Sequence, residues 1–234
     1  MLLSWDEIRK VILKAKGHVL LYGPAGTGKT YLAKLVAKAV ERSYYPVTFS
    51  ADLSAQEVIG HFVPKGGEFV WHYGPALLAW QTGGIFNPNE INECSGAVQI
   101  AMHSILDDPE MAKLCLPSGE VVHPRPGFRC IATMNGEPSD LPLPLLNRFS
   151  LKIKITEPSA EALARIRDKV IRQAVERAYT DGQERITFRD MLAVDTLIKD
   201  GLDTELAYKA VFSDDWQDVH GVIELSRTAP EKKE

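Results

Sequence analysis

The segment from Gly23 to Thr30, with the sequence GPAGTGKT, constrains the fold of this chain more than any other feature. It fits the pattern G-x-x-x-x-G-K-[ST]. A short apolar run precedes it at residues 18–22, and apolar residues at helical spacing follow from Thr30 to Val40. In this order of strand, glycine loop and helix, backbone N–H groups and the positive end of the helix dipole converge on one point, which suits a phosphate group. The alternative is a plain glycine turn that ends a strand.

The loop also predicts which residues contact the phosphates. Glycines allow successive backbone N–H groups to turn inward around an anion. Lys29 is expected to reach the outer phosphates of a nucleotide, and the Thr30 hydroxyl is expected to coordinate Mg²⁺. The candidate nucleotide-binding residues are Gly23, Pro24, Ala25, Gly26, Thr27, Gly28, Lys29, Thr30 and Tyr31.

Strands and helices alternate along the first two thirds of the chain. Buried strands are predicted at residues 18–22, 47–50, 84–87 and 128–134. The segment 150–155 alternates strictly between apolar and polar residues, so one of its faces should be wet, and we expect it at a sheet edge. The pattern predicts an α/β fold with a five-stranded parallel sheet and right-handed crossovers.

Both ends of the chain are predicted to be helical. Ser4 and Glu7 are spaced as a capping box for an opening helix. Composition changes at residues 156–159, and helical stripes follow. The first stripe consists of Leu163, Ile166, Val170, Ala174 and Ala178, and it predicts one helix. We therefore predict an α/β core over residues 1–156, a small all-helical lid over 157–227 and a disordered polar tail over 228–234.

Composition narrows the possible partners. The net charge of -4 gives no support to a nucleic-acid coat or an anionic membrane partner, although a local basic patch is compatible with it. Three cysteines match no zinc pattern and suggest a reducing compartment. The start of the chain carries acids where a signal peptide carries bases, and no apolar run is long enough to span a membrane. We predict a cytoplasmic protein without a membrane partner.

Ordered motifs along nearly the whole chain resemble the MoxR-type, dynein-related branch of the AAA+ ATPases. The glycine loop is followed by a Walker B-like segment at residues 83–92, a sensor-one-like strand at 131–136, an arginine-finger-like segment at 145–149 and a sensor-two-like segment at 186–190. Residues around Gly66 and Gly67 resemble the helix-two insertion of this branch, and residues 113–129 resemble the hairpin before sensor one. The resemblance implies ATP and Mg²⁺ as cofactors.

The resemblance assigns roles to four further residues. It implies that Glu90 orients and deprotonates the attacking water, with Asn135 beside it, and that Arg148 enters the site of a neighbouring subunit while Arg189 brings the lid to the γ-phosphate. Each has an ordinary alternative. Glu90 could be a solvated loop glutamate, and Asn135 could satisfy a turn. Arg148 could form a surface salt bridge, and Arg189 could lie on a helix face.

One position departs from the family pattern. Asn89 stands where the family has an aspartate that holds the magnesium shell, so it is a metal candidate with Thr30 but lacks the negative charge. Either the residue was changed to trap a nucleotide-bound state, or the protein naturally hydrolyses slowly. Asn87 and Pro88 are also unusual for this strand, and we expect its pairing to stop near Phe86.

Three hypotheses for the function follow. The first is an ATPase that works as a homo-oligomeric ring, a hexamer by resemblance, and remodels a protein substrate or adaptor on a separate chain. The second is a nucleotide-gated assembly or adaptor module with little hydrolysis, which Asn89 supports. The third is a nucleic-acid motor, which the acidic composition disfavours. The aromatic residues Phe69, Trp71 and Tyr73 either contact a partner or form cross-strand pairs within their hairpin.

Overall fold

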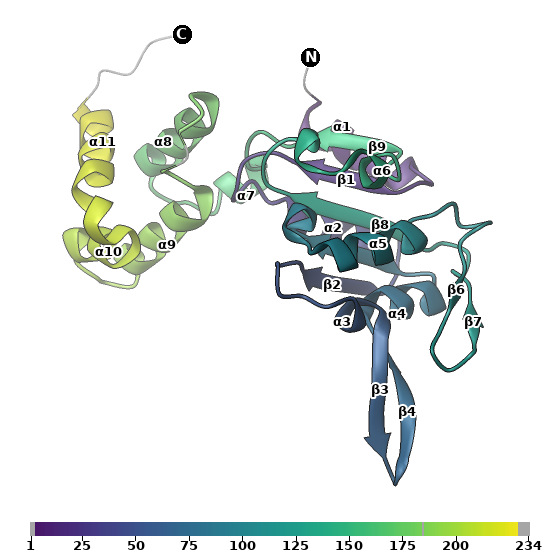
Figure 1. Ribbon diagram of the computed structural model, residues 1–234. Helices are drawn as coiled ribbons and strands as arrows, with labels where there is room; N and C mark the ends of the chain where they lie inside the picture. Colours follow the sequence, from purple (N-terminus) through teal and green to yellow (C-terminus); the bar gives the residue numbers. More distant parts are fainter. Residues whose placement is uncertain (1–2, 184, 229–234) are drawn as a thin grey trace. The chain divides into compact units, whose positions relative to one another are not determined.

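The computed structural model describes residues 3–183 and 185–228 (Figure 1). The described residues form two compact units. The first comprises the chain up to Gly23 together with Lys29–Lys154, and the second comprises Pro24–Gly28 together with the described residues from Ile155 onward. Residues 229–234, most of the predicted disordered tail, lie outside the described part of the chain.

A five-stranded sheet organises the first unit. Its strands are β2 (Tyr44–Thr48), β5 (Ile85–Asn89), β8 (Arg129–Met134), β1 (Val19–Tyr22) and β9 (Leu151–Lys154), in that spatial order. Every neighbouring pair is parallel. The predicted α/β fold is confirmed, and β9 lies at the edge as its alternating pattern indicated. β2 begins before the predicted strand, at Tyr44, and ends at Thr48.

Helices pack on the sheet in two groups. The helices of this unit are α1 (Trp5–Lys14), α2 (Lys29–Ala39), α3 (Ala55–Ile59), α4 (Pro75–Thr82), α5 (Gly96–Ile105) and α6 (Leu143–Leu146). α2 contacts β5 and β8, and α1 packs on α2. Alternate residues of β8, namely Cys130, Ala132 and Met134, join the core cluster that contains the buried side chains of α4 and α5. Since successive strand residues point to opposite faces, α4 and α5 cover one face of the sheet.

The opening helix begins as its sequence predicts. Ser4 accepts a hydrogen bond from the backbone N–H of Glu7, and the Glu7 carboxylate accepts from the Ser4 backbone N–H, at 3.4 and 2.8 Å. This reciprocal pair satisfies two N–H groups that have no partner inside the helix.

Two hairpins extend from this unit. β3 (Gly60–Lys65) pairs antiparallel with β4 (Glu68–Tyr73), and β6 (Leu114–Cys115) with β7 (Val121–Val122). Both were expected. Trp71 lies opposite Phe62 across the first hairpin, with ring centroids 5.2 Å apart, whereas Phe69 is 75% exposed. Cross-strand pairing therefore accounts for Trp71 but not for Phe69.

The part of the second unit that the structure describes from Ile155 onward is helical. It contains α7 (Ala160–Leu163), α8 (Lys169–Thr180), α9 (Phe188–Lys199), α10 (Thr204–Phe212) and α11 (Trp216–Thr228). The apolar stripe from Leu163 to Ala178 does not form one continuous helix. Asp168 interrupts it, because the Asp168 side chain accepts hydrogen bonds from the backbone N–H groups of Val170 and Ile171 and so starts α8.

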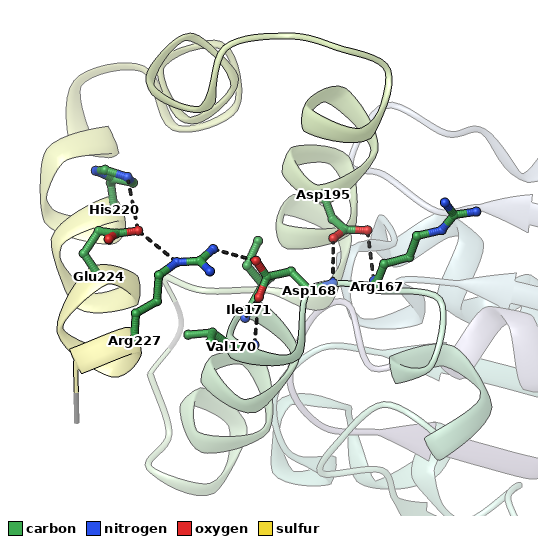
Figure 2. A network of polar contacts seen from close by, with 8 residues as sticks. All are labelled: Arg167, Asp168, Val170, Ile171, Asp195, His220, Glu224 and Arg227. Atoms are coloured by element: carbon green, nitrogen blue, oxygen red, sulfur yellow. Dashed lines mark hydrogen bonds and ion pairs between the residues drawn. The ribbon is translucent and has the colours of Figure 1, made fainter. Parts of the chain in front are cut away.

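A network of polar contacts joins three helices of this unit (Figure 2). The second carboxylate oxygen of Asp168 pairs with Arg227 of α11 at 2.5 Å. Asp195 of α9 is 8% exposed, and its two oxygens accept from the backbone N–H groups of Arg167 and Asp168, both at 3.0 Å. Burial alone raises the pKa of Asp168, but the hydrogen bonds from Arg227, Ile171 and Val170 outweigh it, so the pKa lies below its usual value.

We predict that Asp168→Ala lowers the free energy of unfolding by about 1–2 kcal/mol, because α8 loses its N-cap. Urea unfolding followed by circular dichroism measures this change. The control is Glu205→Ala, which removes only the exposed pair with Lys209 and should cost under about 0.5 kcal/mol. Equal losses in the two variants would contradict the capping role of Asp168.

Candidate nucleotide-binding site

Three neighbouring strands of the first unit end beside one another. β1, β5 and β8 are parallel and adjacent, so their carboxyl ends lie at the same edge of the sheet. Gly23 follows β1, Glu90 follows β5 and Asn135 follows β8. In open α/β sheets this edge is where ligands bind.

Lys29, at the start of α2, is buried at this edge, with only 6% of its surface exposed. Its ammonium group donates hydrogen bonds to the carbonyl oxygen of Gly23 at 3.0 Å and to Oδ1 of Asn135 at 2.9 Å. Burial lowers the pKa of Lys29 to about 8, although the charge of Glu90 opposes the shift. The side chain is therefore a desolvated ammonium group whose pKa lies close to neutral pH.

Glu90 has a left-handed backbone conformation, with φ 54° and ψ 48°. Such a conformation is uncommon for a residue with a side chain, and residues held in it cluster at functional sites. Its carboxylate accepts two hydrogen bonds from Asn135, from the side-chain Nδ2 at 3.0 Å and from the backbone N–H at 3.3 Å. Lys29, Asn135 and Glu90 thus form one continuous chain of hydrogen bonds, which fixes the orientation of the Asn135 amide.

Asn89 is held by two hydroxyl groups. Its Oδ1 accepts from Thr30 at 2.9 Å and from Thr133 at 3.0 Å. These side chains offer only neutral oxygens. Oxygen donors suit Mg²⁺, but the set lacks the carboxylate that usually accompanies it. Among the described residues, no group of three or more His, Cys, Asp or Glu side chains is placed to hold a metal ion.

Asn87 explains how β5 tolerates Pro88. The Asn87 side chain is fully buried, donates to the carbonyl oxygen of Ile131 and accepts from the hydroxyl of Tyr44. Pairing with β8 covers only Ile85 and Phe86, as expected, but pairing with β2 continues to Asn89, so the expected end of the strand at Phe86 was wrong on that side. Pro88 supplies no N–H, and the Asn87 amide takes over the contact with β8.

The loop Pro24–Gly28 belongs to the second unit, where it contacts Tyr179 of α8. The Tyr179 hydroxyl donates to the carbonyl oxygen of Ala25 at 2.9 Å and accepts from the backbone N–H of Phe188 at 3.2 Å. Gly26 has a φ of +74°, and a Cβ atom there would lie 2.9 Å from that hydroxyl. Glycine is therefore required at this position for both space and conformation.

The other predicted residues lie as follows. Arg189 is exposed in the first turn of α9, directly after Phe188. Arg148 pairs with Asp107 at 2.9 Å, the salt-bridge arrangement that the sequence left open, and its Nε is buried without a hydrogen-bond partner among the described residues. The Tyr31 side chain is 59% exposed on α2.

Sequence reasoning missed several polar residues of these clusters. They are Tyr44, Asn87, Thr133, Tyr179 and Thr187. Thr133 and Asn87 carried local signals, since each is a polar residue in or directly after an apolar run, at residues 130–134 and 85–86. The sequence marked Asn87 as unusual but gave it no role. The partners of Tyr179 are distant in sequence, so no local pattern identifies it.

The fold and the residues at the sheet edge define a P-loop nucleotide-binding protein of the α/β class. The family model described as AAA domain (dynein-related subfamily) matches residues 18–149. The chain belongs to this family, and the resemblance seen in the sequence is confirmed.

Individual relatives agree with this assignment. Protein NorQ of Paracoccus denitrificans is 37% identical over 117 residues, which is 50% of this chain and 43% of NorQ. The chain spans about half the length of the curated relatives it matches. A crystal structure of a protein from Cytophaga hutchinsonii has a TM-score of 0.52 at 20% identity, and the match covers 94% of this chain and 67% of the Cytophaga chain. The structure of a RuvB mutant of Thermotoga maritima has a TM-score of 0.51 at 19% identity, and the match covers 96% of this chain and 75% of the RuvB chain. These two structures support the fold alone.

No helix among the described residues has the length and apolar character needed to cross a bilayer.

We predict that Tyr179→Phe increases the hydrogen-exchange rate of the Phe188 amide at least about fivefold, because the loss of one hydrogen bond of about 1 kcal/mol leaves that N–H without its acceptor. Exchange measured by mass spectrometry on peptides that contain Phe188 tests this. Tyr31→Phe, which changes an exposed tyrosine of α2, is the matched control and should leave exchange at Phe188 unaltered. An unaltered rate in Tyr179→Phe would show that this hydrogen bond does not protect the start of α9.

Proposed function

We propose that the chain binds ATP with Mg²⁺ and hydrolyses it. The observation that carries the proposal is the chain of hydrogen bonds from Lys29 through Asn135 to Glu90 at the carboxyl edge of the sheet. It brings a buried cation, a polar amide and a carboxylate within one hydrogen-bonded group, next to the start of α2. Phosphoryl transfer needs mainly charge neutralisation and a positioned water, and these three side chains can supply both.

Each residue then has a defined part in the proposed reaction. Lys29 neutralises charge on the outer phosphates, and the loop Gly23–Gly28 surrounds them with backbone N–H groups. Glu90 accepts a proton from the attacking water, while Asn135 keeps the carboxylate oriented. Thr30 and Asn89 would hold Mg²⁺, and the bound ion would supply charge neutralisation at the phosphates.

The further parts of the proposal concern assembly. Arg148 is proposed to act in the site of a neighbouring copy, which requires its pair with Asp107 to open, and Arg189 is proposed to contact the γ-phosphate within one chain. The working unit would be a ring of six copies that remodels a partner protein or adaptor. The domain division at residue 156 and the cytoplasmic location stay predictions.

A second candidate function rests on Asn89. Its amide oxygen is occupied by two hydroxyl donors and carries no charge, so Mg²⁺ would be held more weakly than by an aspartate. A slow ATPase of this kind would work as a nucleotide-gated assembly module, in which ATP binding rather than turnover controls association.

We predict that ATP binding takes up about 0.9 proton at pH 9 and only about 0.1 at pH 7, because Lys29, with a pKa of about 8, must become charged beside the phosphates. ATP affinity should therefore fall as the pH rises above about 8. Calorimetry in two buffers of different ionisation enthalpy measures the uptake. Lys34→Met, which removes an exposed lysine of the same helix, should leave it unchanged. Equal uptake at both pH values would refute the assignment of Lys29.

We predict that Asn89→Asp raises turnover at least about tenfold, which corresponds to about 1.4 kcal/mol of activation free energy, and lowers the Mg²⁺ concentration needed for half-maximal rate. Phosphate release measured over a range of protein concentrations gives both the rate and its dependence on assembly. The control is Gln56→Glu, which makes the same amide-to-acid change on α3, outside the polar clusters at the sheet edge, and should leave turnover unchanged. Lys29→Ala should abolish nucleotide binding.

The same assay distinguishes the two candidate functions. Turnover that rises cooperatively with protein concentration supports the ring ATPase. ATP-dependent assembly without phosphate release supports the nucleotide-gated module. If Asn89→Asp leaves the rate unchanged, Mg²⁺ is not held through this residue.

A further inference from the structure

A pocket lies in the first unit, at the opposite edge of the sheet from Lys29. Its volume is about 370 Å³. Ile85 and Arg129, the first residues of β5 and β8, contribute to its wall, and because the strands are parallel this is the amino edge. The lining residues are Leu13, Ala15, Lys16, Val40, Arg42, Ile85, Pro109, Gly127, Phe128 and Arg129.

Three basic residues from different parts of the chain line this pocket. Arg129 is 6% exposed, and its Nη1 donates to the carbonyl oxygens of Ile12 and Ala15 at 2.7 and 2.6 Å. Those bonds hold the C-terminal end of α1, but they use only one of the three guanidinium nitrogens. The hydrogen bond of Arg42 to the Gly83 carbonyl oxygen, at 2.9 Å, likewise leaves from Nη1 alone. Both side chains keep N–H groups for another acceptor.

No acid balances these charges within the pocket. None of the ten lining residues carries a carboxylate, and no ion pair joins Lys16, Arg42 or Arg129 to an acid in the described part of the chain. Burial, and then the nearby charge of Arg42, lowers the pKa of Arg129. Two guanidinium groups that repel each other in a partly desolvated pocket would be stabilised by an anion between them.

Gly127 provides the room for this arrangement. It has a φ of +98°, and a Cβ atom at this position would lie 1.6 Å from Nη1 of Arg42. Any other residue would displace the Arg42 guanidinium from its present place. The glycine therefore keeps that group in the wall of the pocket.

We infer that this pocket binds the phosphate group of a small phosphorylated molecule, and that Lys16, Arg42 and Arg129 contact that phosphate. Guanidinium groups match phosphate oxygens in a bidentate fashion, and a dianion balances three cations better than a single carboxylate does. The volume exceeds that of a phosphate alone, and the side chains of Leu13, Val40 and Phe128 supply an apolar wall for the rest of the molecule. This site is separate from the nucleotide loop and does not depend on the proposed ATPase activity.

Calorimetry with phenyl phosphate, and with inorganic phosphate for comparison, tests the inference. The starting protein carries Lys29→Ala, which disables the nucleotide loop as a competing phosphate site. We expect phenyl phosphate to bind it more tightly than phosphate does. Adding Lys16→Gln and Arg42→Gln should raise the dissociation constant at least about tenfold, equivalent to about 1.4 kcal/mol. Sodium benzoate, which offers a carboxylate on the same ring, should bind more weakly than phenyl phosphate.

The matched control removes the same number of charges elsewhere. Lys65→Gln with Lys199→Gln changes two exposed lysines outside the pocket and should leave the dissociation constant unaltered. If Arg42→Gln destabilises the chain, the single variant Lys16→Gln tests the inference. Lys16 is exposed and takes part in no described hydrogen bond, so its substitution should not disturb the fold. We expect it to weaken binding about threefold. Absence of binding, or equal weakening in pocket and control variants, would overturn the inference.

Discussion

The burial of the Lys29 ammonium group determines how the carboxyl edge of the sheet is organised. A buried cation needs hydrogen-bond acceptors, and here the Gly23 carbonyl and the Asn135 side chain provide them. Because Oδ1 of Asn135 accepts from Lys29, the amide turns its Nδ2 toward Glu90 and donates to that carboxylate. One desolvated charge therefore fixes the orientation of the residues that follow β8 and β5.

Much of the fold could be predicted because its signals are local. Strand and helix periods, the Ser4 capping box and the strict alternation of residues 150–155 each depend on neighbouring residues, and the structure has the corresponding elements. The glycine loop identified Lys29 and Thr30 for the same reason, since the motif requires both. The break between α7 and α8 was missed, because Asp168 fits the polar face of a continuous helix as well as it fits an N-cap.

The remaining residues of the site depend on contacts between distant segments. Tyr179 is far from Ala25 in sequence, and the hydroxyls of Thr30 and Thr133 meet at Asn89 only when α2, β5 and β8 are assembled. Asn87 looked like a flaw in a buried strand. Its side chain instead replaces a ladder contact near Pro88, which could be seen only from the register with β8. The sequence indicates which kinds of functional side chain are present, whereas tertiary packing decides which of them come together in one site.

The neutral character of Asn89 affects selectivity as well as rate. An aspartate at this position would repel the phosphates of a nucleotide that arrives without its metal, and it would attract the same nucleotide once Mg²⁺ is bound. An amide that accepts from two hydroxyls exerts neither force strongly. If the chain binds ATP as proposed, the site should discriminate poorly between free and metal-complexed nucleotide, so that its occupancy in a cell would follow total nucleotide more closely than the concentration of available magnesium.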